Sequence, residues 1–180
     1  MLKYNLCYII MDSKILLLNR DYPGWMGCWN GVGGKLEPNE SPRGSMIREI
    51  REETGISSVD LHFKGLKTWS RDDGSGFGGL YLYIGYVSED CLYATPKRTD
   101  EGILEWKDIN WVLHPQNLGV AHDLPSSLRA ALTDSRCFDH HSVFRGNHLE
   151  RETATEIDPQ VEYDRIQRKR YLQKYTNHLD

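Results

Sequence analysis

The sequence predicts an α+β fold in which antiparallel strands are interspersed with helices. Two observations indicate this class. Short apolar runs typical of strands recur between turn-forming segments, as at Tyr4–Ile10 and Lys14–Asn19. A separate segment, Pro42–Thr54, carries helix signals at both of its ends. Because strands and helices are mixed along one chain of 180 residues without internal repeats, we expect them to pack as one sandwich.

The first third of the chain is expected to contain a hairpin, a loop and a helix. A short Met-Asp-Ser turn joins the strands Tyr4–Ile10 and Lys14–Asn19. The segment Asp21–Gly34 is rich in glycine, which permits tight turns and lets backbone approach a ligand closely. The helix Pro42–Thr54 follows a serine suited to the N-cap, begins with proline, and ends before a glycine.

The remaining elements are predicted from the same kinds of signal. The segment Ser70–Gly79 is polar and glycine-rich, so we expect a loop there. The other predicted elements are strands at Val59–Trp69 and Leu80–Val87, a short strand at Ile109–Val112, a helix at Leu124–Leu132, a strand pair within Phe138–Leu149, and a long helix at Asp158–Tyr175.

We divide the chain into a domain over residues 1–157 and a basic amphipathic helical tail over residues 158–180. The basic side chains of the tail are Arg165, Arg168, Lys169, Arg170 and Lys174. Such a tail is either an arm for nucleic acid or a helix that packs on its own domain or on a second subunit. We favour the packed helix, and therefore expect no stable nucleic-acid partner and allow for a homodimer.

Composition excludes some classes of function. The net charge is −4, so no global field draws the chain to nucleic acid or to membranes. No apolar run is long enough to span a bilayer, and no signal peptide is visible. The four cysteines are far apart and form no CxxC pair, which is typical of reduced thiols. We expect a cytoplasmic location, and a negatively charged substrate would need a local positive group.

Three glutamates of the predicted helix carry the chemical signal. Glu49, Glu52 and Glu53 stand at i, i+3 and i+4, so they share one helix face about 100° wide. Three like charges on one face repel each other, and a hard divalent cation among them relieves the repulsion. Oxygen ligands of this kind suit Mg²⁺ or Mn²⁺. The alternative for these glutamates alone is a solvated acidic face.

The residues before these glutamates favour the metal site. Gly33 lies in a glycine pair near the helix entry, where a backbone carbonyl is able to complete a metal shell. Lys35 adds a positive charge for phosphate. Arg48 is placed to pair with Glu52, or with Glu40 near the helix start, and so to hold the carboxylates in register.

The stretch from residue 34 to 56 resembles the Nudix box, Gly-x5-Glu-x7-Arg-Glu-U-x-Glu-Glu-x-Gly-U, where U is a bulky aliphatic residue. The matching positions are Gly34, Glu40, Arg48, Glu49, Ile50, Glu52, Glu53, Gly55 and Ile56. The resemblance implies an α/β/α sandwich with a mixed sheet, in which the box forms a loop–helix–loop. It also implies a metal-assisted attack of water on phosphorus in a nucleoside diphosphate-X compound.

The resemblance also implies roles for individual residues. Glu49 and Glu53 resemble metal ligands, and Glu52 resembles a further ligand, bound directly or through water. Gly33 resembles a carbonyl ligand. Arg48 resembles a structural residue, as does Glu40, and we group Arg48 with the catalytic glutamates that it holds. Glu101 stands where many members place an extra base or ligand, although a lone loop glutamate is often only solvated.

A looser resemblance concerns the substrate. The entry Trp29–Lys35 is similar to that of MutT-type enzymes, which remove 8-oxo-dGTP from the nucleotide pool and so protect DNA. In that group an asparagine at the Asn30 position reads the purine edge, and Asp123 is the nearest candidate for a second reader. The alternatives are a turn residue for Asn30 and a helix cap for Asp123. This sequence has Ala121 and His122 where some members place a stacking tryptophan, and Trp69, Phe77 and Tyr81 are the substitutes.

These features predict a Mg²⁺-dependent enzyme that cuts 8-oxo-dGTP to 8-oxo-dGMP and pyrophosphate, with Asn30, Lys35 and Asp123 binding substrate. Other Nudix substrates remain open: ADP-ribose, a dinucleoside polyphosphate or the 5′ end of RNA. A Nudix-fold regulator that binds a nucleotide without cutting it is a further alternative, although no box glutamate is lost. An isomerase on the same fold would need an added cysteine–glutamate site, which we do not find.

Overall fold

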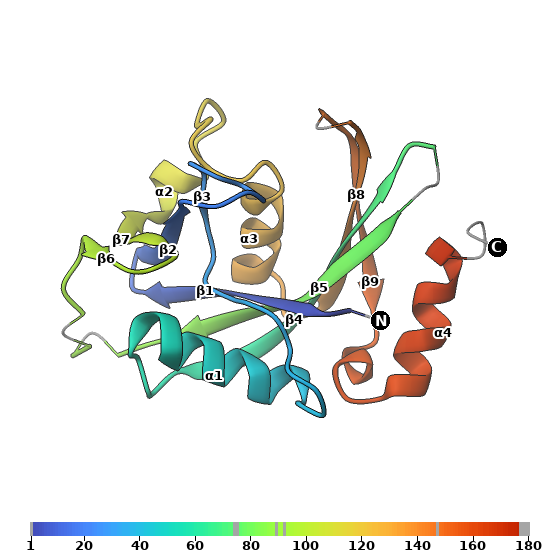
Figure 1. Cartoon of the computed structure of the whole chain (residues 1–180), viewed down its shortest axis with the longest axis horizontal. Coiled ribbons are helices and arrows are strands. Elements are labelled where there is room, and N and C mark those ends of the chain that lie inside the picture. The colour runs from blue at the N-terminus through green and yellow to red at the C-terminus, as the bar shows by residue number, and fades with distance from the viewer. Residues whose placement is uncertain (1, 74–75, 89, 92, 147, 177–180) are drawn as a thin grey trace.

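A computed structural model describes residues 2–73, 76–88, 90–91, 93–146 and 148–176. Its centre is a mixed sheet in the order β6-β7-β2-β1-β5-β4-β8-β9, with β3 paired to β2 (Figure 1). The strands are β1 (Tyr4–Met11), β2 (Lys14–Arg20), β3 (Trp29–Asn30), β4 (Asp60–Arg71), β5 (Phe77–Tyr86), β6 (Lys97–Arg98), β7 (Gly102–Asp108), β8 (Cys137–Arg145) and β9 (His148–Ile157). The pairs β1–β5 and β4–β8 are parallel, and the remaining strand pairs are antiparallel.

Helices cover both faces of this sheet, which confirms the predicted α+β sandwich (Figure 1). They are α1 (Pro42–Thr54), α2 (Ile109–Val112), α3 (Leu124–Thr133), the short 3₁₀ helix η1 (Pro159–Glu162) and α4 (Arg165–Thr176). Successive residues of a strand point to opposite faces. In β1, Cys7 and Ile9 accordingly pack in the core beneath α1 and α4, while Leu6 and Tyr8 pack in the core beneath α3.

The predicted short strand at Ile109–Val112 is wrong. This segment is the helix α2, because the Asp108 side chain accepts hydrogen bonds from the backbone N–H groups of Asn110 and Trp111. That cap outweighs the strand preference of the β-branched residues that follow it. The strand lies just before the cap, as β7, and pairs with β2.

Two predicted segments have different bounds in the structure. Half of the expected loop Ser70–Gly79 belongs to strands β4 and β5, in which Gly78 lies beneath the Trp69 ring. A Cβ on Gly78 would lie 2.4 Å from that ring, so glycine is required there. The expected helix Asp158–Tyr175 is divided into η1 and α4, because Asp164 accepts hydrogen bonds from two backbone N–H groups at the start of α4.

The helix α4 is held on the sheet through a buried carboxylate. Asp139 of β8 is fully buried and accepts hydrogen bonds from Thr68 at 2.7 Å, Tyr171 at 2.8 Å and Tyr175 at 2.7 Å. The ring of Tyr175 also stacks on His141, with ring centroids 4.1 Å apart. The tail therefore packs on its own domain. None of the helices in the described part of the chain has the length and apolar character of a membrane span.

This contact gives a test of how far the tail stabilises the domain. Asp139→Ala should lower the free energy of unfolding by about 1–3 kcal/mol, because it leaves buried hydroxyl groups without an acceptor. Urea denaturation followed by circular dichroism measures the change. Asp90→Ala, in a loop distant in sequence, is the control and should change stability by less than about 0.5 kcal/mol. Equal stability of the two variants would show that the buried contact contributes nothing.

Candidate active site

The glycine-rich loop is held against β1 by backbone hydrogen bonds. Cys7 and Val32 exchange N–H···O bonds of 2.7 and 3.1 Å, and the Asn5 N–H donates to the Gly34 carbonyl at 3.0 Å. The Asn5 side chain accepts from the Gly34 N–H and donates to Ser45 of α1. This buried asparagine, which sequence reasoning missed, therefore fixes the loop relative to the helix that carries the glutamates.

Two glycines of the loop lie very close to other groups. A Cβ on Gly33 would lie 2.3 Å from the Asn5 carbonyl oxygen, and a Cβ on Gly34 would lie 2.4 Å from a carboxylate oxygen of Glu49. A side chain at Gly33 would meet the backbone of β1, and one at Gly34 would displace the Glu49 carboxylate, so the loop lies against both β1 and the helix face that carries Glu49. The carbonyl predicted as a metal ligand and the Glu49 carboxylate thus belong to one site.

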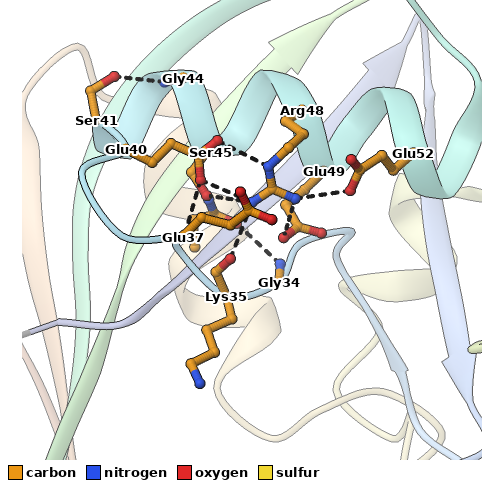
Figure 2. A network of polar contacts seen from close by, with 11 residues as sticks. Gly34, Lys35, Glu37, Glu40, Ser41, Gly44, Ser45, Arg48, Glu49 and Glu52 are labelled. Carbon is orange, nitrogen blue, oxygen red and sulfur yellow. Dashed lines mark hydrogen bonds and ion pairs between the residues drawn. The ribbon is translucent and has the colours of Figure 1, made fainter.

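Arg48 is the centre of the hydrogen bonds in the box (Figure 2). Its guanidinium group donates two bonds of 2.9 Å to Glu40, one of 3.0 Å to Glu49 and one of 2.9 Å to Glu52. It also donates to the Lys35 carbonyl at 3.2 Å. The Arg48 hydrogen bonds lower the pKa of Glu40 to about 2. Both pairings expected for Arg48 are present, so it orients the glutamates.

The glutamates of α1 differ in their surroundings. Glu49 is mostly buried, whereas the Glu52 side chain is 59% exposed and turned toward Arg48 (Figure 2). Burial raises the pKa of Glu53 to about 8, and the nearby carboxylates of Glu101 and Glu49 add to this rise. Glu101 is half-exposed, and Arg20 lies 3.9 Å from its carboxylate. The structure therefore gathers Glu49, Glu53 and Glu101, while Glu52 lies at the rim.

The oxygen atoms here fit a hard divalent cation. The Glu53 Oε2 atom is buried without a hydrogen-bond partner, which is a cost that a cation would remove. Carboxylate and carbonyl oxygens are the ligands that Mg²⁺ and Mn²⁺ prefer. Glu49, Glu53 and the Gly33 carbonyl would hold the ion. Among the described residues, no group of three or more His, Cys, Asp or Glu side chains is close enough to hold an ion by itself, so a backbone carbonyl is needed beside the carboxylates.

One pocket of about 590 Å³ connects the glycine loop to the predicted base readers. Its lining includes Gly33, Lys35 and Glu101, together with Asn30 and Asp123. The alternative role considered for Asp123, a helix cap, is absent, because its side chain makes no hydrogen bond to the start of α3. The Asn30 side-chain oxygen accepts from the Gly31 N–H at 2.9 Å, so the turn role considered for Asn30 is present.

Sequence reasoning missed Lys67 of β4, which also lines the pocket. Lys67 is buried, and its Nζ lies 2.8 Å from the Asp123 carboxylate. Of the three proposed stacking residues, Trp69 lines the pocket, Phe77 stacks on Tyr175 of α4, and Tyr81 is buried beneath Arg168. The missed lysine had no local signal, because it meets Asp123 only through the fold.

Comparison with known proteins agrees with this geometry. The family model described as NUDIX domain matches residues 1–132. The chain belongs to the Nudix family. The uncharacterized Nudix hydrolase YvcI of Bacillus subtilis (strain 168) is 36% identical over 115 residues, which are 64% of this chain and 69% of that protein. This Nudix hydrolase also resembles phosphatase NudJ of Escherichia coli (strain K12), at 28% identity over 112 residues, 62% of this chain and 71% of NudJ.

A solved structure extends the likeness beyond the box. The crystal structure of a MutT protein from Bacillus halodurans matches with a TM-score of 0.71 at 25% identity, and the match covers 86% of this chain and 97% of that one. Nudix hydrolases generally use divalent metal ions such as Mg²⁺. The family assignment therefore agrees with the oxygen-rich site between α1 and the glycine loop.

The buried glutamate gives the first test of the site. Glu53→Gln should lower kcat at least about a hundredfold, because it replaces a carboxylate that would bind the cation with a neutral amide of the same shape. Turnover is measured as pyrophosphate or phosphate released, and circular dichroism checks the fold. Glu37→Gln, at an exposed glutamate of the loop before α1, is the control and should keep normal turnover. A chelator should abolish turnover, and Mg²⁺ should restore it. Normal turnover in Glu53→Gln, or in chelated enzyme, would contradict this site.

Proposed function

We propose that the chain is a Mg²⁺-dependent pyrophosphohydrolase of nucleoside triphosphates, with oxidised purines such as 8-oxo-dGTP as its preferred substrates. The products would be the nucleoside monophosphate and pyrophosphate. The observation that carries the proposal is the shared pocket, whose lining includes the loop and Lys35 of the box as well as Asn30 and Asp123. We also propose that it acts in the cytoplasm to clear damaged nucleotides before DNA synthesis. Its four cysteines are free thiols.

The phosphate groups require positive charge and a proton acceptor. Lys35 and Arg20 line the pocket and supply cationic groups for phosphate oxygens. A bound Mg²⁺ neutralises phosphate charge and makes its bound water more acidic. Glu53, Glu49 and Glu101 are the proposed ligands and proton acceptors. Arg48 holds Glu49 by its hydrogen bond, so the glutamates keep their positions before substrate binds.

The base requires apolar walls and a few fixed polar groups. The walls of the pocket include Leu6, Leu80, Trp69 and Phe144. Because the Asn30 oxygen is bonded to the Gly31 N–H, its amide NH₂ group is oriented to donate. Guanine N7 is an acceptor, and oxidation at C8 converts it to an N–H donor beside a new carbonyl oxygen. A pocket that offers both a donor, the Asn30 amide, and an acceptor, the Asp123 carboxylate, is therefore suited to distinguish guanine from 8-oxoguanine.

The preference is tested with Asn30. In the wild type, kcat/KM for 8-oxo-dGTP should exceed that for dGTP. Asn30→Ala should reduce this ratio on the order of 10-fold or more, because a base group is left unpaired. Asn110→Ala, on the exposed side of α2, is the matched control and should leave the ratio unchanged.

The substrate panel should include ADP-ribose, a dinucleoside tetraphosphate and 5′-triphosphorylated RNA. A wild-type enzyme without preference for the oxidised purine, or one that prefers another member of this panel, would overturn the sanitising role. The family assignment would survive either result.

A further inference from the structure

Lys67 and Asp123 form a buried ion pair whose burial hydrolysis alone does not explain. Burying two charges is costly, and a buried pair is often no more stable than apolar residues of the same volume. Here the pair also lies in the lining of the pocket, next to the proposed base site. An ion pair that costs free energy at this position needs a functional explanation. The hydrogen bonds that Lys67 and Asp123 make provide one.

All three N–H donors of Lys67 are directed into the protein. Its Nζ lies 2.8 Å from the Asp123 Oδ2 atom, 3.3 Å from the Asp123 carbonyl oxygen and 3.3 Å from the Tyr8 hydroxyl oxygen. Tyr8 in turn lies 2.7 Å from the Ser127 hydroxyl, which donates to the same Asp123 carbonyl at 2.7 Å. Lys67 therefore has no donor left for a substrate and acts only through Asp123.

One oxygen atom of this network has no hydrogen-bond partner in the described part of the protein. The Asp123 Oδ1 atom is buried and has no hydrogen-bond partner. An unpaired carboxylate oxygen in a pocket is a strong acceptor, and leaving it unpaired costs free energy. A substrate that offers an N–H group to Oδ1 completes the network. A substrate that offers a lone pair meets repulsion instead.

The titratable groups around the Asp123 carboxylate include Lys67, His140 and Glu152. Burial opposes the charge on Lys67, but Asp123 and Tyr8 outweigh it, so the pKa of Lys67 is raised. Burial and Lys67 lower the pKa of His140, on β8, to about 4, so His140 is neutral at physiological pH. Burial raises the pKa of Glu152 of β9, whose carboxylate is bound to Ser126 at 2.6 Å. Lys67 is therefore the cation that compensates the carboxylate.

We propose that Lys67 is a specificity-determining residue that holds Asp123 as an acceptor-only carboxylate, so that the site accepts bases offering an N–H group and rejects bases offering only lone pairs. Lys67 is a positioning residue, because it touches Asp123 and not the base. This inference rests on the proposed function, since it assumes a nucleoside triphosphate in the pocket. It adds the chemical class of base that the pocket takes.

A matched set of purines isolates the N–H group. Purine deoxyriboside triphosphate has only ring acceptors on its base, whereas dATP adds an amino group and dITP adds a ring N–H and a carbonyl. In the wild type, kcat/KM for the better of dATP and dITP should exceed that for the unsubstituted purine on the order of 10- to 100-fold. Equal values for all three nucleotides would overturn the inference while leaving the hydrolase proposal intact.

Two variants test the role of the lysine. Lys67→Met removes the compensating charge, so the buried acid takes up a proton and gains a donor. The preference for N–H-bearing purines should fall at least about tenfold and should fall further from pH 8 to pH 6, whereas the wild-type ratio should stay constant. Lys64→Met is the matched control on the same strand, because Lys64 binds the Asp134 carbonyl outside the pocket, and it should keep the wild-type ratio.

Asp123→Asn tests the inference even if Lys67→Met fails to fold. Its oxygen would face Lys67, so its NH₂ group would point into the pocket as a donor. The preference should then reverse in favour of the unsubstituted purine. An unchanged preference in Asp123→Asn would overturn the inference. Loss of hydrolysis of every nucleotide by the wild type would overturn the proposed function and this inference together.

Discussion

One guanidinium group, that of Arg48, binds three carboxylates at the entry and on one face of α1, and the arrangement of the active site depends on it. Without Arg48, the charge of Glu40, which precedes the helix, and the charges of Glu49 and Glu52, which lie on it, would repel each other. With it, Glu40 is anchored near the helix entry and Glu49 is turned toward the glycine loop (Figure 2). The remaining negative charge is concentrated where an ion and phosphate groups would enter.

The parts of the site that lie close in sequence could be predicted from sequence. Helical spacing places Glu49 and Glu53 together, and a Cβ on Gly34 would lie against the Glu49 carboxylate. The helix α1 was predicted with its exact bounds, because its serine, proline and glycine signals all act locally. Local rules decide such segments, and the structure therefore agrees with them.

The parts assembled by the fold could not be predicted in this way. Lys67 and Asp123 are 56 residues apart, and only the packing of α3 on the sheet brings them together. Asn5 is likewise unremarkable in sequence, yet it connects the loop to Ser45. The wrong strand at Ile109–Val112 has a related cause, because one capping aspartate decided between two structures that the apolar residues alone allow. The amphipathic character of the tail is visible in its own sequence, but the buried carboxylate that accepts its hydrogen bonds, that of Asp139, lies on strand β8.

The alternation of side chains along β4 connects the two faces of the molecule. Thr68 points to Asp139 and the tail helix, while its neighbours Lys67 and Trp69 line the pocket on the other side. Because these three residues are consecutive on one strand, the backbone of β4 supports both the contact with α4 and the pocket wall. The tail thus shares a mechanical support with the substrate without touching it. Sequence drift in this helix would be constrained by ligand recognition as well as by folding.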